Sequence, residues 1–247
     1  CSHRQARNNS KCGLNNETPL RSSSALFPPL LREITAAPQE LYVRGNVALL
    51  SHPHCIAVVG TRMMTSYGRQ VLEHIIPPIV RAGAVIVSGL AFGIDAYSHE
   101  VALNNGGKCI AVFGCGVNTV YPKSNRSLAE KILQSGGTLV SEYPPGTEAR
   151  KEHFPARNRI ISGLSKATIV VEAKEKSGSL ITARFALEQN RDLLAVPGNI
   201  FHAHQQGTNQ LISQGAVPVV SSEDLLRHLG FESTAASYTS ENPEQQT

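Results

Sequence analysis

Short, continuous apolar runs recur along the chain and are separated by longer stretches with helical spacing. The runs cover residues 55–59, 84–87, 108–113, 138–140, 167–172, 192–196 and 217–220. Because they do not alternate apolar with polar positions, they predict strands that are covered on both faces. Strands that alternate with helices predict an α/β fold, a doubly wound and mostly parallel sheet with helices on both faces.

The spacing of apolar residues between these runs predicts the helices. They are expected over residues 67–82, 93–104, 125–134, 158–165, 179–189, 208–213 and 222–229. Pro77 and Pro78 lie inside the first of them and should kink or divide it. Ser222 is the predicted cap of the last. Residues 27–46 are predicted to be a lead-in that packs on the domain and ends in a short strand.

The chain of 247 residues is long enough for one large domain, which we place at residues 26–230. Residues 1–25 are rich in Ser, Asn and Arg and lack hydrophobic periodicity, so they are predicted to be disordered or tag-like. Residues 231–247 are polar and predict a frayed C-terminal tail.

Composition narrows the class of protein. No run approaches the roughly 18 apolar residues of a membrane span, so no membrane partner is expected. The five cysteines include no CxxC pair, and Cys55 and Cys109 lie in or beside apolar strands. Disulfides and a zinc site are therefore not expected, which favours a reducing compartment, the cytoplasm. The net charge of +4 permits an anionic partner without requiring one.

Small and polar residues follow the strands at the points where they end. Ser88, Gly89 and Gly93 follow the run 84–87, and Gly60–Thr61–Arg62 follow the run 55–59. In a parallel sheet these loops lie at one edge, where open α/β folds bind ligands. Unpaired N–H groups where such a loop enters a helix favour an anion, above all a phosphate. A plain turn is the alternative for any one loop.

The densest polar stretch, residues 150–162, places cationic side chains around Phe154. A helix is expected to start near Asn158. Arginine suits phosphate oxygens and a Phe ring can stack a base, so the stretch resembles a single-stranded nucleic-acid groove. Arg62, Arg157 and Arg159 are predicted to form a phosphate-binding cluster. The alternative is a solvated loop with Phe154 in the core.

A second candidate phosphate site lies at residues 177–182. Ser177, Gly178 and Ser179 offer hydroxyl and backbone N–H groups at a helix start, and Thr182 lies one turn further on. Ordinary helix capping explains the same residues equally well.

Evidence for catalysis is thin. Glu142 and Glu172 are predicted to end adjacent strands, where they could act as a base or grip a ribose. Asp95 and His99 are four residues apart on one helix and could form a hydrogen-bonded pair. Such residues are more often structural. His202 and His204 lack a third ligand, so no metal is predicted, and no cofactor is expected.

Several spaced motifs resemble one family. They are Val59–Gly60–Thr61–Arg62, Ser88 to Asp95, Phe154 to Ile161, Val171–Glu172–Ala173, Ser177 to Ala183 and Ala195 to Gly198. In this order they resemble the bacterial DNA-processing protein A family, also called Smf. The resemblance runs from about residue 27 to residue 229.

The resemblance implies a Rossmann-like domain that binds single-stranded DNA, protects incoming strands in natural transformation and helps to load the RecA recombinase. It also implies a homodimer without established enzymatic activity. Residues 211–220 resemble the region that contacts the second copy and the recombinase. The expected DNA-binding residues are Gly60, Thr61, Arg62, Ser88, Gly89, Gly93, Lys151, Phe154, Arg157, Asn158, Arg159, Ser177, Gly178, Ser179 and Thr182.

The chain departs from the family in two ways and leaves an alternative open. The small helical domain that usually precedes the fold and the winged-helix module that often follows it are not expected here. The sheet and its phosphate loops also resemble nucleotide-cleaving enzymes of the lysine-decarboxylase-like group, which release a base from a nucleoside monophosphate. This chain lacks their Pro-Gly-Gly-x-Gly-Thr pattern and has residues 177–182 instead. A module that senses a nucleotide is a third reading.

Overall fold

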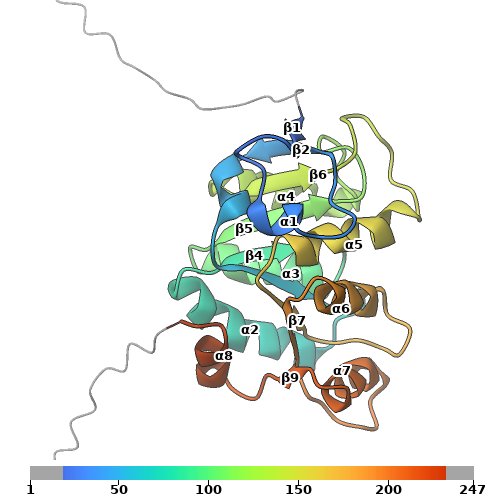
Figure 1. The fold of residues 1–247 in the computed structure, drawn as a ribbon. Helices are drawn as coiled ribbons and strands as arrows, with labels where there is room; N and C mark the ends of the chain where they lie inside the picture. Colours follow the sequence, from blue (N-terminus) through green and yellow to red (C-terminus); the bar gives the residue numbers. More distant parts are fainter. Residues whose placement is uncertain (1–18, 232–247) are drawn as a thin grey trace, which may run out of the picture.

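The computed structural model describes residues 19–231. The predicted disordered segment and polar tail lie outside this range, except for residues 19–25 and Phe231. Leu20 and Arg21 form a short strand, so the prediction of disorder is wrong for them. Figure 1 shows a single layer of strands with helices on both sides.

The described residues form nine strands in one sheet, with the order β1-β2-β6-β5-β4-β3-β7-β8-β9. The strands are β1 (Leu20–Arg21), β2 (Glu40–Gly45), β3 (Cys55–Val59), β4 (Val85–Ser88), β5 (Lys108–Phe113), β6 (Thr138–Ser141), β7 (Ala167–Val170), β8 (Asp192–Ala195) and β9 (Val217–Pro218). Strands β3 to β9 run parallel, whereas β2 is antiparallel to β6 and to β1. The predicted doubly wound, mostly parallel sheet is confirmed.

The helices divide between the two faces of the sheet. They are α1 (Pro29–Arg32), α2 (Ser66–Arg81), α3 (Ile94–Asn104), α4 (Arg126–Gln134), α5 (His153–Gly163), α6 (Gly178–Glu188), α7 (Ala203–Ser213) and α8 (Ser222–His228), with short 3-10 helices η1 (Val47–Ser51) and η2 (Lys123–Asn125). One core lies under α2, α3, α4 and α8. The other lies under α1, α5 and α6, with α7 at its border. Covering both faces explains why the central strands are apolar throughout.

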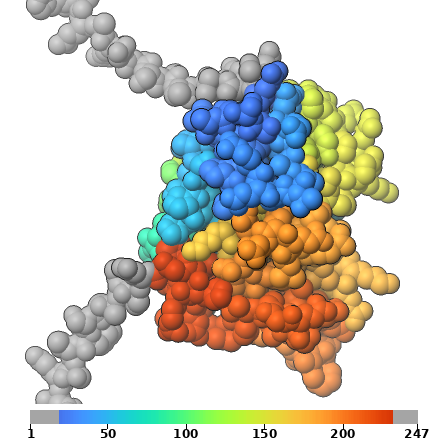
Figure 2. Space-filling view, in the orientation of Figure 1, coloured from blue at the N-terminus to red at the C-terminus, as the bar shows by residue number. Residues whose placement is uncertain are grey.

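The lead-in packs on the domain as predicted. Phe27 and Leu31 are fully buried against the second core, and β2 adds an antiparallel strand next to β6. Figure 2 shows the N-terminal segment and the C-terminal segment at opposite ends of one continuous body.

Three local predictions need correction. The α2 helix is continuous across Pro77 and Pro78, so the predicted division is wrong. Burial of its five large apolar side chains, at about 1.5–3 kcal/mol each, outweighs the two prolines, at about 3 kcal/mol each. The cap of α8 is Ser221, whose Oγ accepts the N–H of Asp224 at 3.1 Å, rather than Ser222.

The third correction matters most for the site. Helix α5 begins at His153, five residues before the predicted start near Asn158. Pro155 falls in its first turn, where backbone N–H groups have no partner within the helix and a proline costs little. Phe154 and Arg157 therefore lie on a helix face rather than in a loop.

Candidate single-stranded nucleic-acid interface

A cavity of about 590 Å³ opens at the edge of the sheet where the parallel strands end. We call it the edge cavity. It lies where the strand order changes direction, between β3 and β7, which is where open α/β sheets bind ligands. Of the fifteen predicted residues, ten line it: Gly60, Arg62, Lys151, Phe154, Arg157, Asn158, Ser177, Gly178, Ser179 and Thr182.

The loop after β3 exposes one cation to the edge cavity. The backbone N–H of Thr61 donates to the carbonyl of Glu172 at 2.8 Å, and its carbonyl accepts from the N–H of Ile94 at 3.2 Å. Thr61 is therefore anchored and buried, while the next side chain, Arg62, is exposed and lines the cavity. Within residues 19–231, no carboxylate forms an ion pair with Arg62.

Ser88, Gly89 and Gly93 shape the loop after β4 and do not line the edge cavity. The Ser88 hydroxyl is buried and donates to the carbonyl of Val58 at 2.7 Å. Gly93 has φ +72°, and a Cβ there would lie 2.4 Å from the carbonyl oxygen of Thr61. These residues allow the loops after β3 and β4 to approach closely, so their contribution to the site is indirect.

Arg157 forms the floor of the edge cavity and is only 4% exposed. Its Nη1 donates to the carbonyl of Gly89 at 2.7 Å and also to that of Val112, which ties the ends of β4 and β5 together. A Cβ on Gly89 would lie 2.4 Å from this nitrogen, so a larger residue there would displace the guanidinium from its carbonyl contacts. The phosphate-binding role predicted for Arg157 stays a prediction: the side chain lines the edge cavity, but it is buried and its Nη1 is used by the two carbonyl groups.

Asp95 lies beside Arg157 and is also buried. Its Oδ2 accepts the N–H of Gly89 at 3.2 Å. Burial raises the pKa of Asp95, and the Arg157 guanidinium offsets part of that rise. Burial likewise lowers the pKa of Arg157, and Asp95 opposes that change. Each charge therefore makes burial of the other less costly. Hydrogen bonds among the described residues do not join Asp95 to His99, so the pairing predicted for these two is wrong.

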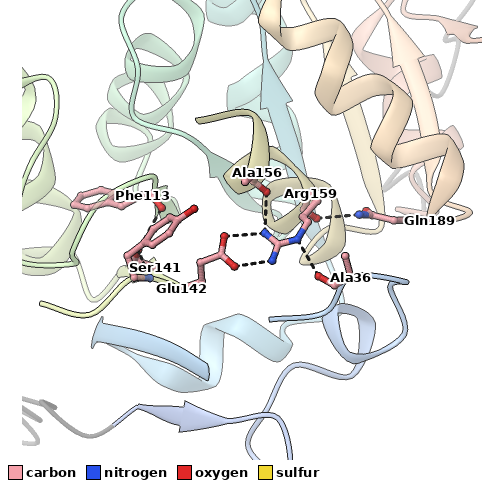
Figure 3. A network of polar contacts seen from close by, with 8 residues as sticks. Ala36, Phe113, Ser141, Glu142, Ala156, Arg159 and Gln189 are labelled. Carbon is pink, nitrogen blue, oxygen red and sulfur yellow. Dashed lines mark hydrogen bonds and ion pairs between the residues drawn. The ribbon is translucent and has the colours of Figure 1, made fainter. Parts of the chain in front are cut away.

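Arg159 does not reach the edge cavity, and the predicted three-arginine cluster is wrong on this point. Figure 3 shows its guanidinium held by Glu142 in a two-pronged ion pair, with Nη1–Oε1 at 2.8 Å and Nη2–Oε2 at 2.6 Å. Its Nε donates to the carbonyl of Ala36 at 2.9 Å, and Nη1 also donates to that of Ala156. The side chain is 15% exposed and joins α5 to the end of β6 and to the lead-in.

Phe154 lies in the first turn of α5, with its ring close to two guanidinium groups. The Cζ of Arg62 is 5.7 Å from the ring centroid and that of Arg157 is 6.0 Å away, distances at which cation–π attraction operates. The loop after β5 supplies Gly114 at the ring edge and a second aromatic, Tyr121, at 5.4 Å between centroids. Lys151, just before α5, is exposed and lines the same cavity.

The N-terminus of α6 faces the edge cavity from the other side. Ser177 is its N-cap and accepts the N–H of Ser179 at 3.4 Å. Asn158 on α5 donates to the carbonyl of Gly178 at 3.2 Å, which fixes the two helices relative to each other. Figure 1 shows α5 and α6 side by side on one face of the sheet. The N-terminal end of an eleven-residue helix, with its dipole, favours an anion here.

Glu172 is fully buried, and its carboxylate is used in hydrogen bonds within the fold. Its carboxylate accepts from the N–H of Thr65 at 3.0 Å, from the Thr65 hydroxyl and from Nε2 of Gln205 at 3.0 Å. Glu142 follows β6 and Glu172 follows β7, and those strands are not neighbours in the sheet, so the predicted adjacency is wrong. Neither carboxylate lines the edge cavity.

Replacing Thr65 with alanine is expected to lower the free energy of unfolding by about 1–2 kcal/mol, because α2 loses its N-cap and Glu172 loses a buried donor. Urea unfolding measures this change, and Thr65→Ser is the matched control that keeps both bonds. Unaltered stability would contradict the assignment of Glu172 to the scaffold.

Among residues 19–231, no group of three or more His, Cys, Asp or Glu side chains could hold a metal ion. Cys55, Cys109 and Cys115 are free thiols in the buried part of this range. No helix in the described range is long and apolar enough to cross a membrane.

Sequence reasoning missed Tyr121, Thr65 and Gln205. Tyr121 could have been found, because it follows the glycine-containing loop after β5, one of the strands whose ends were expected to meet. Gln205 lies 33 residues from Glu172, and no local pattern links the two.

Known proteins match this chain over most of its length. The model of the family described as DNA recombination-mediator protein A matches residues 19–230. DNA processing protein DprA of Bacillus subtilis is 47% identical over 207 residues, which are 84% of this chain and 69% of that protein. Protein Smf of Escherichia coli is 43% identical, and the match covers 87% of this chain but only 58% of that protein.

Two solved structures share the fold at significant sequence identity. DNA processing protein A from Streptococcus pneumoniae superposes with a TM-score of 0.81 at 44% identity, covering 87% of this chain and 74% of that one. The protein of the same name from Helicobacter pylori has a TM-score of 0.77 at 31% identity, covering 86% and 94%. The study of the latter concerns its single-stranded DNA binding mode. A molybdenum cofactor binding protein from Rippkaea orientalis, at 14% identity and a TM-score of 0.52, shares the fold alone.

Proposed function

Because the chain belongs to the DNA recombination-mediator protein A family, we propose that it binds single-stranded DNA in the edge cavity and acts as a recombination mediator. The observation that carries this proposal is the convergence on one cavity of two exposed cations, a helix N-terminus and two aromatic rings. Cations and free N–H groups suit phosphates, and the rings suit unpaired bases.

The position of the charges supports a strand rather than a duplex. The edge cavity is a hollow lined mainly by loops and the N-terminal parts of helices, whereas an element that reads a major groove must enter that groove. Binding through phosphates and ring faces carries little sequence preference. The proposed ligand is therefore single-stranded DNA of any sequence.

The biological role that we propose is the one that the family resemblance implies. In this proposal the protein protects incoming strands during natural transformation in the cytoplasm and helps to load RecA. It acts as a homodimer through residues 211–220, where α7 ends and β9 forms the last strand of the sheet. Val220 follows that strand and is 65% exposed, which suits a contact surface.

An enzymatic function is the second candidate and has less support. A base-releasing reaction on a nucleoside monophosphate needs a carboxylate at the ligand. Asp95 lines the edge cavity, but its carboxylate is buried and accepts the N–H of Gly89 beside Arg157. Glu172 is held by Thr65 and Gln205 beneath the surface, and Glu142 is paired with Arg159. The proposed role is therefore binding without catalysis.

The test is fluorescence anisotropy with a labelled oligothymidylate and with the matching duplex, each at two salt concentrations. The proposal expects tighter binding to the single strand and a steep loss of affinity with salt. Equal binding to both forms would contradict it. If no strand binds, base release from nucleoside monophosphates becomes the next assay.

Replacing Arg62 with alanine is expected to weaken single-strand binding about tenfold, because an exposed guanidinium at the edge cavity is lost. The log–log dependence of affinity on salt should become shallower by about 0.7, the change for one phosphate contact on a single strand.

The matched control for Arg62 is Arg227→Ala. Arg227 is 79% exposed, pairs with Asp224 on α8 and lies outside the edge cavity. Arg227→Ala removes one positive charge, as Arg62→Ala does. If both substitutions weaken single-strand binding equally, only the net charge of the protein matters, and the assigned site is contradicted.

A further inference from the structure

The two aromatic rings of the edge cavity differ in how they are covered. Phe154 is half-buried: the guanidinium groups of Arg62 and Arg157 lie within about 6 Å of its ring centroid, and its ring edge lies against Gly114, where a Cβ would come within 3.1 Å. Tyr121 packs against Phe154 with 40° between the ring planes and is 47% exposed. The accessible aromatic surface of the cavity therefore belongs mainly to Tyr121.

The loop that carries Tyr121 is held in place. The N–H of Gly116 donates to the carbonyl of Thr147 at 2.8 Å, and that of Thr119 donates to the carbonyl of Gly116 at 2.8 Å. After Tyr121 the chain enters η2, where the Asn125 side chain donates to the carbonyl of Leu90 at 2.9 Å. A ring on an anchored loop loses little conformational freedom when a ligand stacks on it.

We propose that Tyr121 is the surface on which a base stacks, and that Phe154 holds Arg62 and Tyr121 in position. This inference rests on the proposed single-strand binding and adds a residue to that site. The phosphate contacts the α6 N-terminus and Arg62, and the attached base lies against the exposed face of Tyr121. Tyr121 contacts the base directly and contributes no charge, so its effect depends on the base and not on the backbone.

The experiment compares two labelled strands of equal length, an oligothymidylate and a sugar–phosphate strand that carries no bases. Tyr121→Ala is expected to weaken binding of the oligothymidylate roughly tenfold, the effect of losing one stacked base, and to leave binding of the base-free strand unchanged. Tyr121→Phe keeps the ring and should bind both strands like the parent protein. Arg62→Ala should weaken binding of both.

A second readout uses the absence of tryptophan from the chain. Tyr121→Trp places one fluorophore at the proposed stacking position, and its emission should be quenched by the oligothymidylate and not by the base-free strand. Phe201→Ala is the control aromatic, because Phe201 is 87% exposed in the loop after β8 and lies outside the edge cavity. It should leave both affinities unchanged.

The outcomes separate the two proposals. If the parent protein binds no single strand, the proposed function fails and this inference fails with it. If the parent binds while Tyr121→Ala binds both strands normally, only the stacking role is overturned. An equal loss for both strands, or an unquenched Tyr121→Trp, would also overturn it, because stacking requires the base.

Discussion

Replacing Arg157 with alanine is expected to lower the free energy of unfolding by about 2–6 kcal/mol, about 1–3 kcal/mol for each buried hydrogen-bond acceptor that is left without a partner. The guanidinium bonds the carbonyl groups of Gly89 and Val112, so its loss leaves two buried acceptors without their partner. It also leaves the carboxylate of Asp95 without a counter-charge. Urea unfolding measures the change. The control is Arg227→Ala, which removes an exposed ion pair and should change the free energy of unfolding by at most about 1 kcal/mol.

A double substitution separates the charge interaction between Arg157 and Asp95 from the carbonyl contacts of Arg157. Asp95→Asn removes the buried charge, so in the Arg157→Ala background it should destabilise less than it does alone. The coupling between the two positions is expected to be on the order of 0.5–3 kcal/mol. Additive effects would show that Arg157 acts only through Gly89 and Val112. Strand binding by these variants must be measured under conditions where each is folded.

The fold could be predicted because each strand is marked by its own short apolar run in the sequence. Runs such as Cys55–Val59 and Lys108–Phe113 are apolar without alternation, and only a strand covered on both faces buries every position. The observed strands begin and end within a residue or two of the predicted runs. The edge at which the loops meet then follows from parallel pairing, which is why most of the predicted site residues line one cavity.

The prediction of a three-arginine cluster is wrong for Arg159, because it rests on a helix start placed five residues too late. With α5 beginning at His153, residues Phe154, Arg157, Asn158 and Ile161 follow the spacing i, i+3, i+4, i+7 and share one face, and all four line the edge cavity. Arg159 is two positions from Arg157, about 200° around the helix, and points elsewhere. Its partner, Glu142, lies 17 residues away on another element, which no local pattern could specify.

The contacts of Glu172 could not be predicted either, because its partners also lie far away in the sequence. Glu172 ends a strand in the same way as a ligand-binding residue would, and its residue type does not distinguish the two roles. Only the position of Thr65, 107 residues earlier, and of Gln205 decides that the carboxylate is used internally. Apolar periodicity records which face is buried, whereas the pairing of buried polar groups depends on the assembled fold.

Acid is expected to destabilise the protein through His99, which is fully buried on α3. Burial lowers the pKa of His99 to about 3, and the Ser88 backbone offsets only part of this effect. The unfolded chain binds the proton near the ordinary value of about 6.5, so the unfolded state holds more protons than the folded state between these two values. Stability is therefore complete above about pH 6.5 and is lost progressively as the pH falls below it.

The size of this effect follows from the same two values. From about pH 7 to about pH 4.5 the contribution of His99 amounts to a loss of about 2.5 kcal/mol in the free energy of unfolding. Other groups titrate in this window, Asp95 among them with its raised pKa, so the test is the difference between the parent and His99→Gln. Urea unfolding across this range should show a flatter pH profile for the variant. Parallel profiles would mean that His99 titrates in the folded protein as it does in the unfolded chain, which its burial between α3 and the sheet makes costly.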